Sequence, residues 1–198
     1  MVKALVVVAH PDDETIWCGG TILMHPEWDW TIISLCRRDD ANRAPKFGKA
    51  CRQFGAKCAM SDLDDENLEK EMPLDEVKTR IRAMLRETKA GSSFDFIYTH
   101  GANGEYGHNR HKEVHAAVKE MIAGEQLGCK KIFFFSYKLS AQRDHCEPNE
   151  EGASVNTRLS EQIARKKTLL ITSAYEFSMQ SFEQRSAQRV ESFVAVDE

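Results

Sequence analysis

Four side chains that can bind metal ions or transfer protons lie together near the start of the chain: His10, Asp12, Asp13 and Glu14. They directly follow a short apolar run, residues 5–9. Imidazole and carboxylate groups both bind a borderline-soft dication such as Zn2+, and a catalytic zinc commonly takes three protein ligands and keeps one position for water. His10 and Asp13 can supply two of these ligands, so the third must come from elsewhere in the chain.

A second group of chemically active side chains lies in residues 99–118, at His100, His108, His111 and His115. The last three are spaced three and four residues apart, which places them near one another on one face of a helix. Only His108 and His111 are close enough to the predicted start of that helix to face a site at its end. We expect His100 and His115 to have packing or hydrogen-bonding roles.

Short apolar runs recur along the chain and predict the strands that position these residues. The predicted strands are residues 5–9, 31–35, 57–60, 94–99 and 131–136. Unbroken runs of this kind are typical of strands buried on both faces of a parallel sheet. Segments with helical spacing lie between them, which indicates βαβ units and a doubly wound α/β fold. Ligands bind outside the carboxyl ends of such strands, so the loops after the first, second and fourth strands should share one mouth.

The remaining segments are predicted from spacing and charge. We predict helices at residues 74–88, 111–122, 157–171 and 176–187, and loops at residues 37–46 and 142–155. The charged run 62–71 should lie on the surface. Gly19 and Gly20 lack the Gly-x-Gly-x-x-Gly spacing of dinucleotide sites, and we interpret them as positions where a helix packs closely.

Length and composition limit the class of protein. A chain of 198 residues can bury one core, so we expect a single domain over residues 1–198, with a homo-oligomer left open. The 27 basic and 31 acidic side chains are mixed and form no basic stripe, which argues against a nucleic-acid partner. The apolar run at the start is too short for a signal peptide or membrane span, and the six spaced cysteines indicate free thiols; we therefore expect a cytoplasmic protein without a membrane partner.

A family resemblance rests on these same motifs. The sequence "AHPDDE" followed by "GG", together with a distant Thr-His and Tyr-Gly-His-x-x-His, resembles the zinc-dependent N-deacetylases of the PIG-L/LmbE type. This resemblance implies a Rossmann-like three-layer αβα fold with a mainly parallel sheet. It also implies a hydrolase that acts on linear amides and removes an acetyl group from a small N-acetylglucosamine-type amino sugar or its conjugate, with Zn2+ or another divalent cation such as Fe2+ as cofactor.

The resemblance also implies roles for individual residues. The metal would be held by His10, Asp13 and His111. Asp12 would be the general base, and His108 the neighbouring electrophile or acid.

Three further positions are assigned more loosely. Tyr106 matches a mobile active-site tyrosine of some family members, and Arg43 is a candidate substrate-binding residue. Glu14 is expected to hold a metal ligand or the loop in position without binding the ion itself. Many family members carry an Arg-x-x-Glu pair where this chain has Arg43 and Lys46, and His-Pro-Asp-His where it has His-Asn-Arg-His, so the substrate and the hydrogen bonding of His108 are left open.

Other interpretations compete with this one. Asp12 or Asp13 could simply cap a helix N-terminus, where acidic residues are favoured. The chain could instead be an amidase on a non-sugar or thiol-conjugate amide, or a metal-binding protein whose catalysis has lapsed. Asp12 argues against the last alternative, because a purely structural metal site needs no free carboxylate beside it.

Overall fold

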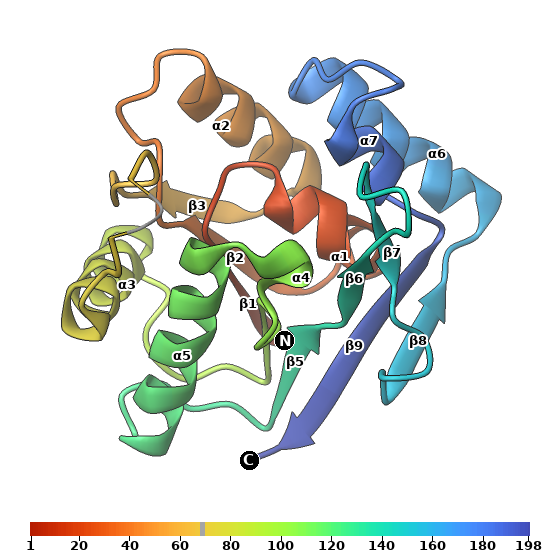
Figure 1. The fold of residues 1–198 in the computed structure, drawn as a ribbon. Coiled ribbons are helices and arrows are strands. Elements are labelled where there is room, and N and C mark those ends of the chain that lie inside the picture. Colours follow the sequence, from red (N-terminus) through yellow and green to blue (C-terminus); the bar gives the residue numbers. More distant parts are fainter. Residues whose placement is uncertain (68–69) are drawn as a thin grey trace.

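The described residues, 1–67 and 70–198 of a computed structural model, form a seven-stranded sheet between two layers of helices (Figure 1). The strand order is β3-β2-β1-β4-β5-β9-β8; β1 to β5 run parallel, and β9 runs antiparallel to both of its neighbours, β5 and β8. The strands are β1 (Lys3–Val8), β2 (Asp29–Ser34), β3 (Lys57–Met60), β4 (Phe96–Thr99), β5 (Lys131–Phe135), β8 (Val155–Arg158) and β9 (Val190–Asp197). The predicted Rossmann-like, mainly parallel αβα fold is therefore confirmed.

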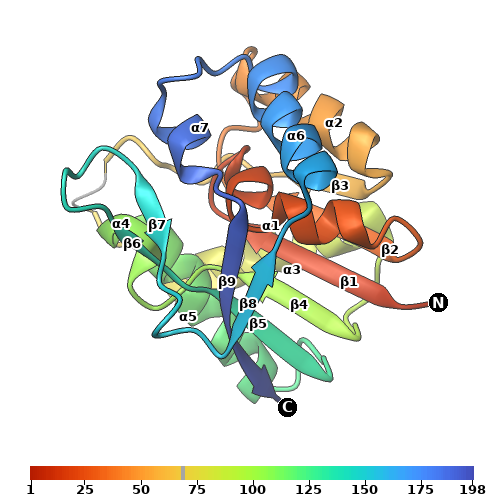
Figure 2. The ribbon, with the colours of Figure 1, turned by 90° about the vertical axis from the view of Figure 1, so that its right-hand side faces the viewer.

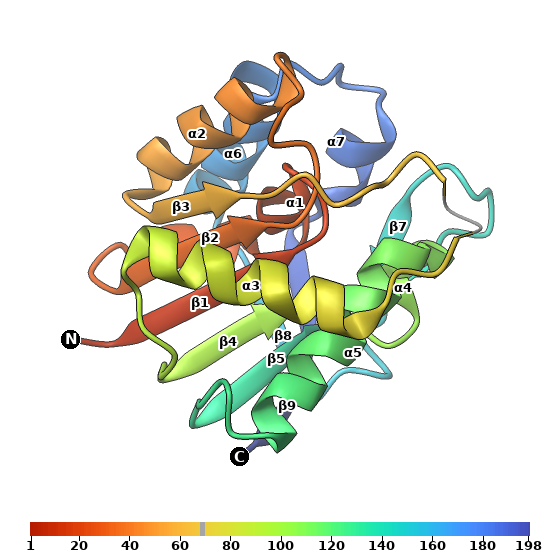
Figure 3. The same ribbon diagram turned by 90° about the vertical axis from the view of Figure 1, so that its left-hand side faces the viewer.

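Helices cover both faces of this sheet (Figures 2 and 3). On one face lie α1 (Asp13–Met24), α2 (Arg43–Phe54) and α6 (Glu161–Leu169), and on the other lie α3 (Leu74–Thr88) and α5 (Asn109–Ala123). Alternate residues of β1 enter two separate cores: Val6 packs on the α1 side, and Val7 packs on the α3 and α5 side. Because both faces of β1 are buried after the exposed Lys3, its sequence is apolar at every position from Ala4 to Val8 rather than at every second one.

The order of the sheet brings two segments to one place. β1 lies between β2 and β4, so the crossovers that leave β1 and β4 go to opposite sides of the sheet. This is the topological switch point at which α/β proteins bind ligands. The segment that follows β1 contains His10 to Glu14, and the segment that follows β4 contains His100 and the short helix α4 (Gly104–Gly107).

Two of the predicted helices are wrong in extent. Residues 157–158 belong to β8, and the helix begins only after Ser160, whose side chain accepts a hydrogen bond from the backbone N–H of Ile163; it then continues as a π-helical segment, η1 (Leu170–Ala174). The predicted helix 176–187 is reduced to α7 (Phe182–Ser186), which Ser181 caps in the same way. Both caps show that serine side chains, rather than the apolar spacing, determine where these helices start.

Both predicted loops contain regular structure. α2 begins at Arg43, where Asp40 accepts hydrogen bonds from the backbone N–H groups of Asn42 and Arg43. Pro45 lies in the first turn of α2, where its missing N–H costs no intrahelical bond. The loop predicted at 142–155 contains β7 (Cys146–Pro148), which pairs with β6 (Tyr137–Leu139).

A buried ion pair fixes α1 to the C-terminal part of the chain. Glu191 of β9 accepts hydrogen bonds from the backbone N–H groups of Gly20 (2.7 Å) and Thr21 (2.8 Å), and from Lys167 Nζ of α6 (2.7 Å). Lys167 and Glu191 are almost completely buried. Breaking such a pair by removing one partner leaves an uncompensated charge in the core. None of the helices in the described ranges is both long and apolar enough to cross a membrane.

The two adjacent glycines of α1 provide a test of this packing. A Cβ atom at Gly20 would overlap the buried Leu159 side chain and lie 2.9 Å from Glu191 Oε1, whereas a Cβ at Gly19 would make only ordinary contacts at 3.4 Å or more. We expect Gly20→Ala to lower the free energy of unfolding by about 1–3 kcal/mol through overpacking. Gly19→Ala, the matched control, should be neutral or raise it by up to about 1 kcal/mol through helix propensity. Urea unfolding of both variants measures the difference, and equal effects would contradict the packing interpretation.

Candidate active site

The segment after β1 turns sharply at Asp12. Asp12 has a φ of 141°, a conformation that L-residues rarely adopt, and the turn is held by hydrogen bonds from the His10 N–H to Asp13 Oδ2 (2.8 Å) and from the Asp12 N–H to Glu14 Oε2 (3.1 Å). Among the described residues, the Asp12 side chain receives no capping hydrogen bond, although Asp12 is the residue before α1. The capping alternative is therefore wrong for Asp12, and its carboxylate is turned toward the site.

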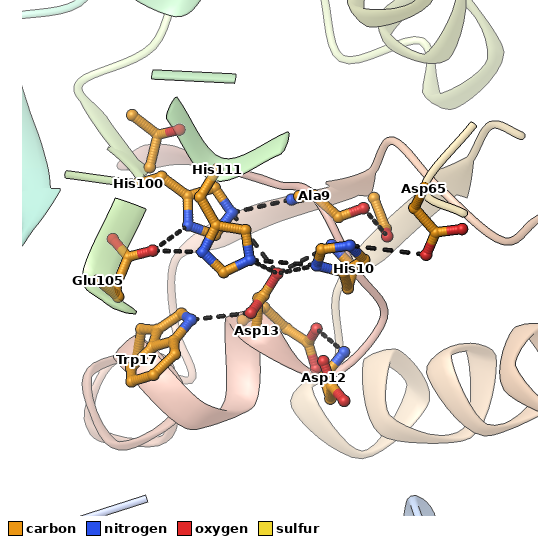
Figure 4. A network of polar contacts seen from close by, with 12 residues as sticks. Ala9, His10, Asp12, Asp13, Trp17, Asp65, His100, Glu105 and His111 are labelled. Carbon is orange, nitrogen blue, oxygen red and sulfur yellow. Dashed lines mark hydrogen bonds and ion pairs between the residues drawn. The ribbon is translucent and has the colours of Figure 1, made fainter. Parts of the chain in front are cut away.

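Three potential metal-binding atoms meet at the end of this turn. His10 Nδ1 lies 3.1 Å from His111 Nε2 and 3.3 Å from Asp13 Oδ2, and the last two atoms are 3.4 Å apart (Figure 4). A tetrahedral ion with bonds of about 2.0–2.1 Å requires its ligand atoms to be separated by roughly 3.3 Å. Two imidazole nitrogens and a carboxylate oxygen at these separations fit a divalent cation.

Glu105 holds the imidazole of His111, a role that the sequence analysis missed. Glu105 Oε2 contacts Nδ1 of His111 (2.5 Å) and Nδ1 of His100 (2.8 Å), and its Oε1 accepts a hydrogen bond from the Gly101 N–H (2.8 Å). These contacts place a proton on Nδ1 of His111 and leave the Nε2 lone pair facing Asp13. Burial raises the pKa of Glu105, but the imidazoles of His100 and His111 outweigh it and lower this pKa to about 2.

The other two histidines make the hydrogen bonds expected of them. His100 is completely buried, and its Nε2 accepts a hydrogen bond from the backbone N–H of Ala9 (2.9 Å), so this lone pair is already used although the atom lies 3.5 Å from Asp13 Oδ2. His115 Nδ1 contacts the backbone oxygen of His100 (2.9 Å), and its ring packs on Phe134. Both residues therefore make hydrogen bonds that hold the backbone around the site.

His108 lies beside the three potential ligand atoms. Its ring centroid is 4.7 Å from those of both His10 and His111, and 5.6 Å from that of Tyr106. Burial, followed by the neighbouring imidazoles of His111 and His10, lowers the pKa of His108 to about 3, so the ring is neutral near pH 7. Its Nδ1 is buried and has no hydrogen-bond partner in the part of the chain that the structure describes. Arg110, which stands where family members commonly have aspartate, donates hydrogen bonds to backbone oxygens of the loop after β3.

A small cavity opens in front of these groups. Its volume is about 160 Å3, and its walls include Asp12, Arg43, Tyr106 and Glu183. Arg43 Nη2 is 3.3 Å from Asp12 Oδ2, and its guanidinium lies 4.8 Å from the centre of the Phe177 ring. Burial and the Asp13 charge raise the pKa of Asp12 well above its usual range, while Arg43 acts in the opposite direction. The candidate base and both candidate substrate-binding residues thus share one cavity.

Glu14 supports the turn from the core, as expected for a residue that fixes the loop. In addition to the Asp12 N–H, it accepts hydrogen bonds from the hydroxyl groups of Thr15 (2.5 Å) and Tyr175 (2.6 Å). Burial raises the pKa of Glu14 to about 7 despite these hydrogen bonds.

Lys46, which replaces the glutamate common in the family, pairs with Glu176 (3.0 Å).

The acidic run 62–71 is not simply a surface segment, so that prediction is wrong for part of it; residues 68 and 69 lie outside the described residues. Leu63 is buried, and the Asp65 carboxylate accepts a hydrogen bond from Arg37 Nε (2.6 Å) and lies 3.6 Å from His10 Nε2. The loop after β3 therefore also reaches the site. Its many charges hid this role in the sequence, because neither spacing nor hydropathy distinguishes Asp65 from its solvent-exposed neighbours.

The low pKa of Glu105 predicts how stability depends on pH. Because this pKa falls from its usual 4.5 to about 2 on folding, Glu105 stabilises the fold above pH 4.5, and the contribution is lost as the pH falls toward 2. We expect the free energy of unfolding of wild type to exceed that of Glu105→Gln by about 3 kcal/mol at most near neutral pH. This difference should decrease as the pH falls from 4.5 to 2. Denaturant unfolding of both proteins between pH 7 and 2.5 measures it. A difference that stays constant with pH would show that Glu105 is not ionised in the fold.

Comparisons with known proteins found a relative by sequence and several similar structures. The uncharacterized protein L374 of Acanthamoeba polyphaga mimivirus is 24% identical over 124 residues, a match that covers 56% of this chain and 53% of that protein; the matched part thus spans about half of this relative. GalB, the 4-carboxy-2-hydroxymuconate hydratase of Pseudomonas putida KT2440, superposes with a TM-score of 0.71 at 15% identity, over 100% of this chain and 97% of its own.

N,N'-diacetylchitobiose deacetylase of Pyrococcus horikoshii superposes with a TM-score of 0.68, also at 15% identity, over 98% of this chain and 84% of its own. At such identities the likeness shows the fold alone, and a hydratase and a deacetylase share it. The sequence match is more specific. The family model for "PIG-L: GlcNAc-PI de-N-acetylase" matches residues 5–122, which include both histidine and carboxylate motifs of the cavity. This match extends over more than half of the chain, which therefore belongs to the PIG-L family.

Proposed function

We propose that this protein is a metal-dependent hydrolase that removes the N-acetyl group from an N-acetylglucosamine-type amino sugar or its conjugate. The observation that carries the proposal is the arrangement of His10 Nδ1, Asp13 Oδ2 and His111 Nε2 within 3.4 Å of one another, beside a cavity that the Asp12 carboxylate lines. Membership of the PIG-L family supports the N-deacetylase assignment, and the likeness to chitobiose deacetylase is consistent with a sugar substrate.

The cation proposed for this site is Zn2+, with Fe2+ as the alternative, held by His10, Asp13 and His111. When bound, such an ion lowers the pKa of water toward about 7 and polarises an amide carbonyl. Two imidazoles and one carboxylate supply three ligands, so a fourth coordination position would be left for water or the amide oxygen. Glu105 contributes by keeping the Nδ1 proton of His111 in place, which directs Nε2 to the ion.

Different residues of the cavity would transfer protons and bind the substrate. Asp12 takes the proton of the attacking water on its carboxylate and delivers it to the nitrogen of the leaving amine. Arg43, 3.3 Å away, holds that carboxylate in the cavity. His108 is neutral and donates a hydrogen bond to the amide oxygen as negative charge develops there. Tyr106 and Arg43 form the walls against which the substrate binds.

We also propose that residues 1–198 form a single domain whose partner is a small molecule. The sheet supports the single domain, because it contains both β1 and β9, which lie near opposite ends of the sequence. The pair between Glu191 and the backbone of α1 further joins the C-terminal part to the segment that carries the site.

Acetate release is the direct test. The apoprotein should release no acetate from N-acetylglucosamine or from N,N'-diacetylchitobiose, and added Zn2+ or Fe2+ should restore the release. Hydrolysis only of non-sugar or thiol-conjugate amides would favour the amidase alternative. Binding of metal without turnover of any amide would favour a lapsed enzyme, and addition of water to an unsaturated acid instead would favour the hydratase activity that GalB has on this fold.

Metal content tests the ligand assignment. We expect His10→Ala, Asp13→Ala and His111→Ala each to lose the bound ion, because each removes one of the three converging atoms. His115→Ala is the matched control: it lies one helical turn from His111 and hydrogen-bonds to a backbone oxygen, so its metal content should equal that of wild type. Elemental analysis of the purified variants gives the answer. Full occupancy in all three ligand variants, or loss of metal from His115→Ala, would refute the assignment.

Asp12 has a test that separates catalysis from structure. Asp12→Asn should keep the fold and the metal but reduce turnover by about 10²–10⁴-fold, as for a lost general acid–base group. A structural role predicts instead a lower melting temperature with little change in turnover per folded molecule. Metal content, melting temperature and turnover are measured on one preparation. Loss of the ion from this variant would make Asp12 a ligand rather than the base.

A further inference from the structure

The outer nitrogen of His10 faces a carboxylate that the proposed mechanism does not use. Nδ1 of His10 points to Asp13 and His111, whereas Nε2 lies 3.6 Å from Asp65 Oδ2, an ion-pair separation longer than a hydrogen bond (Figure 4). A cation bound at Nδ1 leaves the remaining ring proton on Nε2 and draws electrons from the ring, so that N–H needs an acceptor. Asp65 Oδ2 is the carboxylate oxygen nearest to it that the structure records.

The second imidazole of the cluster has the same arrangement. Nε2 of His111 points inward, and its outer Nδ1 contacts the carboxylate of Glu105 at 2.5 Å. Each of the two rings therefore carries a carboxylate on the side away from the cluster. The carboxylates come from different segments, Glu105 from the helix that follows β4 and Asp65 from the loop that follows β3, so the pairing does not arise from one local turn.

The position of Asp65 is determined by two arginines. Arg37, which has a φ of 67°, donates a hydrogen bond from Nε to Asp65 Oδ2 (2.6 Å). Arg110 of α5 is completely buried and donates to backbone oxygens on both sides of Asp65, those of Asp64 (2.5 Å) and Asn67 (2.9 Å). The hydrogen bonds of Arg110 thus fix the backbone beside Asp65, and the hydrogen bond of Arg37 fixes the Asp65 carboxylate.

We propose that Asp65, held by Arg37, is the positioning residue of His10: its carboxylate accepts a hydrogen bond from Nε2–H and orients the ring so that the Nδ1 lone pair is directed at the ion. This inference rests on the metal assignment of the proposed function. It gives the acidic loop 62–67 a role in metal affinity, although none of its side chains belongs to the three converging ligands.

A second ion between His10, Cys36 and Asp65 is the competing interpretation, because their ligand atoms lie within 4.8 Å of one another. Two features disfavour it. The guanidinium of Arg37 already occupies Asp65, and burial of Cys36 raises the pKa of its thiol well above the usual range, which opposes the thiolate that a metal requires. The proposal therefore expects one ion per chain.

Asp65→Asn tests the proposal, because it keeps the size of the side chain and removes the charge. We expect the affinity for Zn2+, measured by competition with a chromophoric chelator, to fall by about 10–100-fold while the melting temperature of the apoprotein is unchanged. In the Co2+-substituted protein, the visible spectrum should shift, because the geometry at His10 changes. Asp62→Asn is the matched control: Asp62 lies on the same loop as Asp65, but its carboxylate pairs with Arg80 of α3, so the affinity of this variant for Zn2+ should equal that of wild type.

Several outcomes overturn the proposal. These are an unchanged affinity in Asp65→Asn, an equal loss in Asp62→Asn, or a second equivalent of Zn2+ in wild type that disappears in Cys36→Ser. If Asp65→Asn does not fold, Arg37→Gln leaves the carboxylate in place and removes only the group that holds it; it should weaken Zn2+ binding in the same direction, and unchanged or tighter binding would contradict the proposal. If the His10, Asp13 and His111 variants retain metal, the metal assignment itself fails. If they lose it while Asp65→Asn binds normally, only this inference fails.

Discussion

A single buried carboxylate, Glu105, orients the histidines at the switch point of the sheet. Its Oε2 contacts the Nδ1 atoms of His100 and His111, and this leaves both Nε2 atoms as acceptors. One acceptor receives the N–H of Ala9 at the end of β1, and the other faces Asp13. The ends of β1 and β4 are thus connected through two imidazoles and one carboxylate, and any catalytic geometry at this edge depends on that connection.

Three consecutive acidic residues take three different environments because the backbone turns between them. Asp13 is held by the Trp17 indole N–H and the His10 N–H, and Glu14 points into the core toward Tyr175. The positive φ of Asp12 separates its side chain from both and turns it to the cavity. A strained residue of this kind is maintained only when its surroundings hold it, which is the function of the Glu14 carboxylate at the Asp12 N–H.

The elements that could be predicted from the sequence are those whose burial leaves a local pattern of apolar residues. β1 and α3 were recognisable because burial on both faces leaves an unbroken apolar run and burial on one face leaves helical spacing. The switch-point cluster followed from where those strands end. Glu105 was not recognisable, because its role requires a turn with a φ of 56° and two histidines from different segments. Lys167 and β9 were missed for a similar reason: a lysine in a polar helix reads as exposed until its partner Glu191 is brought to it by the fold.

The departures of this chain from its family also have a physical explanation in the fold. A lysine at position 46 would place an extra positive charge near Arg43, but Lys46 pairs with Glu176 and leaves Arg43 to Asp12. Arg110 stands where family members commonly have aspartate beside His108, and it is turned to the loop after β3, where its guanidinium holds backbone oxygens. Within residues 1–67 and 70–198, the buried Nδ1 of His108 has no hydrogen-bond partner, whereas the acidic loop is held next to His10. Arg110 therefore supports the loop that carries Asp65, next to His10, and does not support His108.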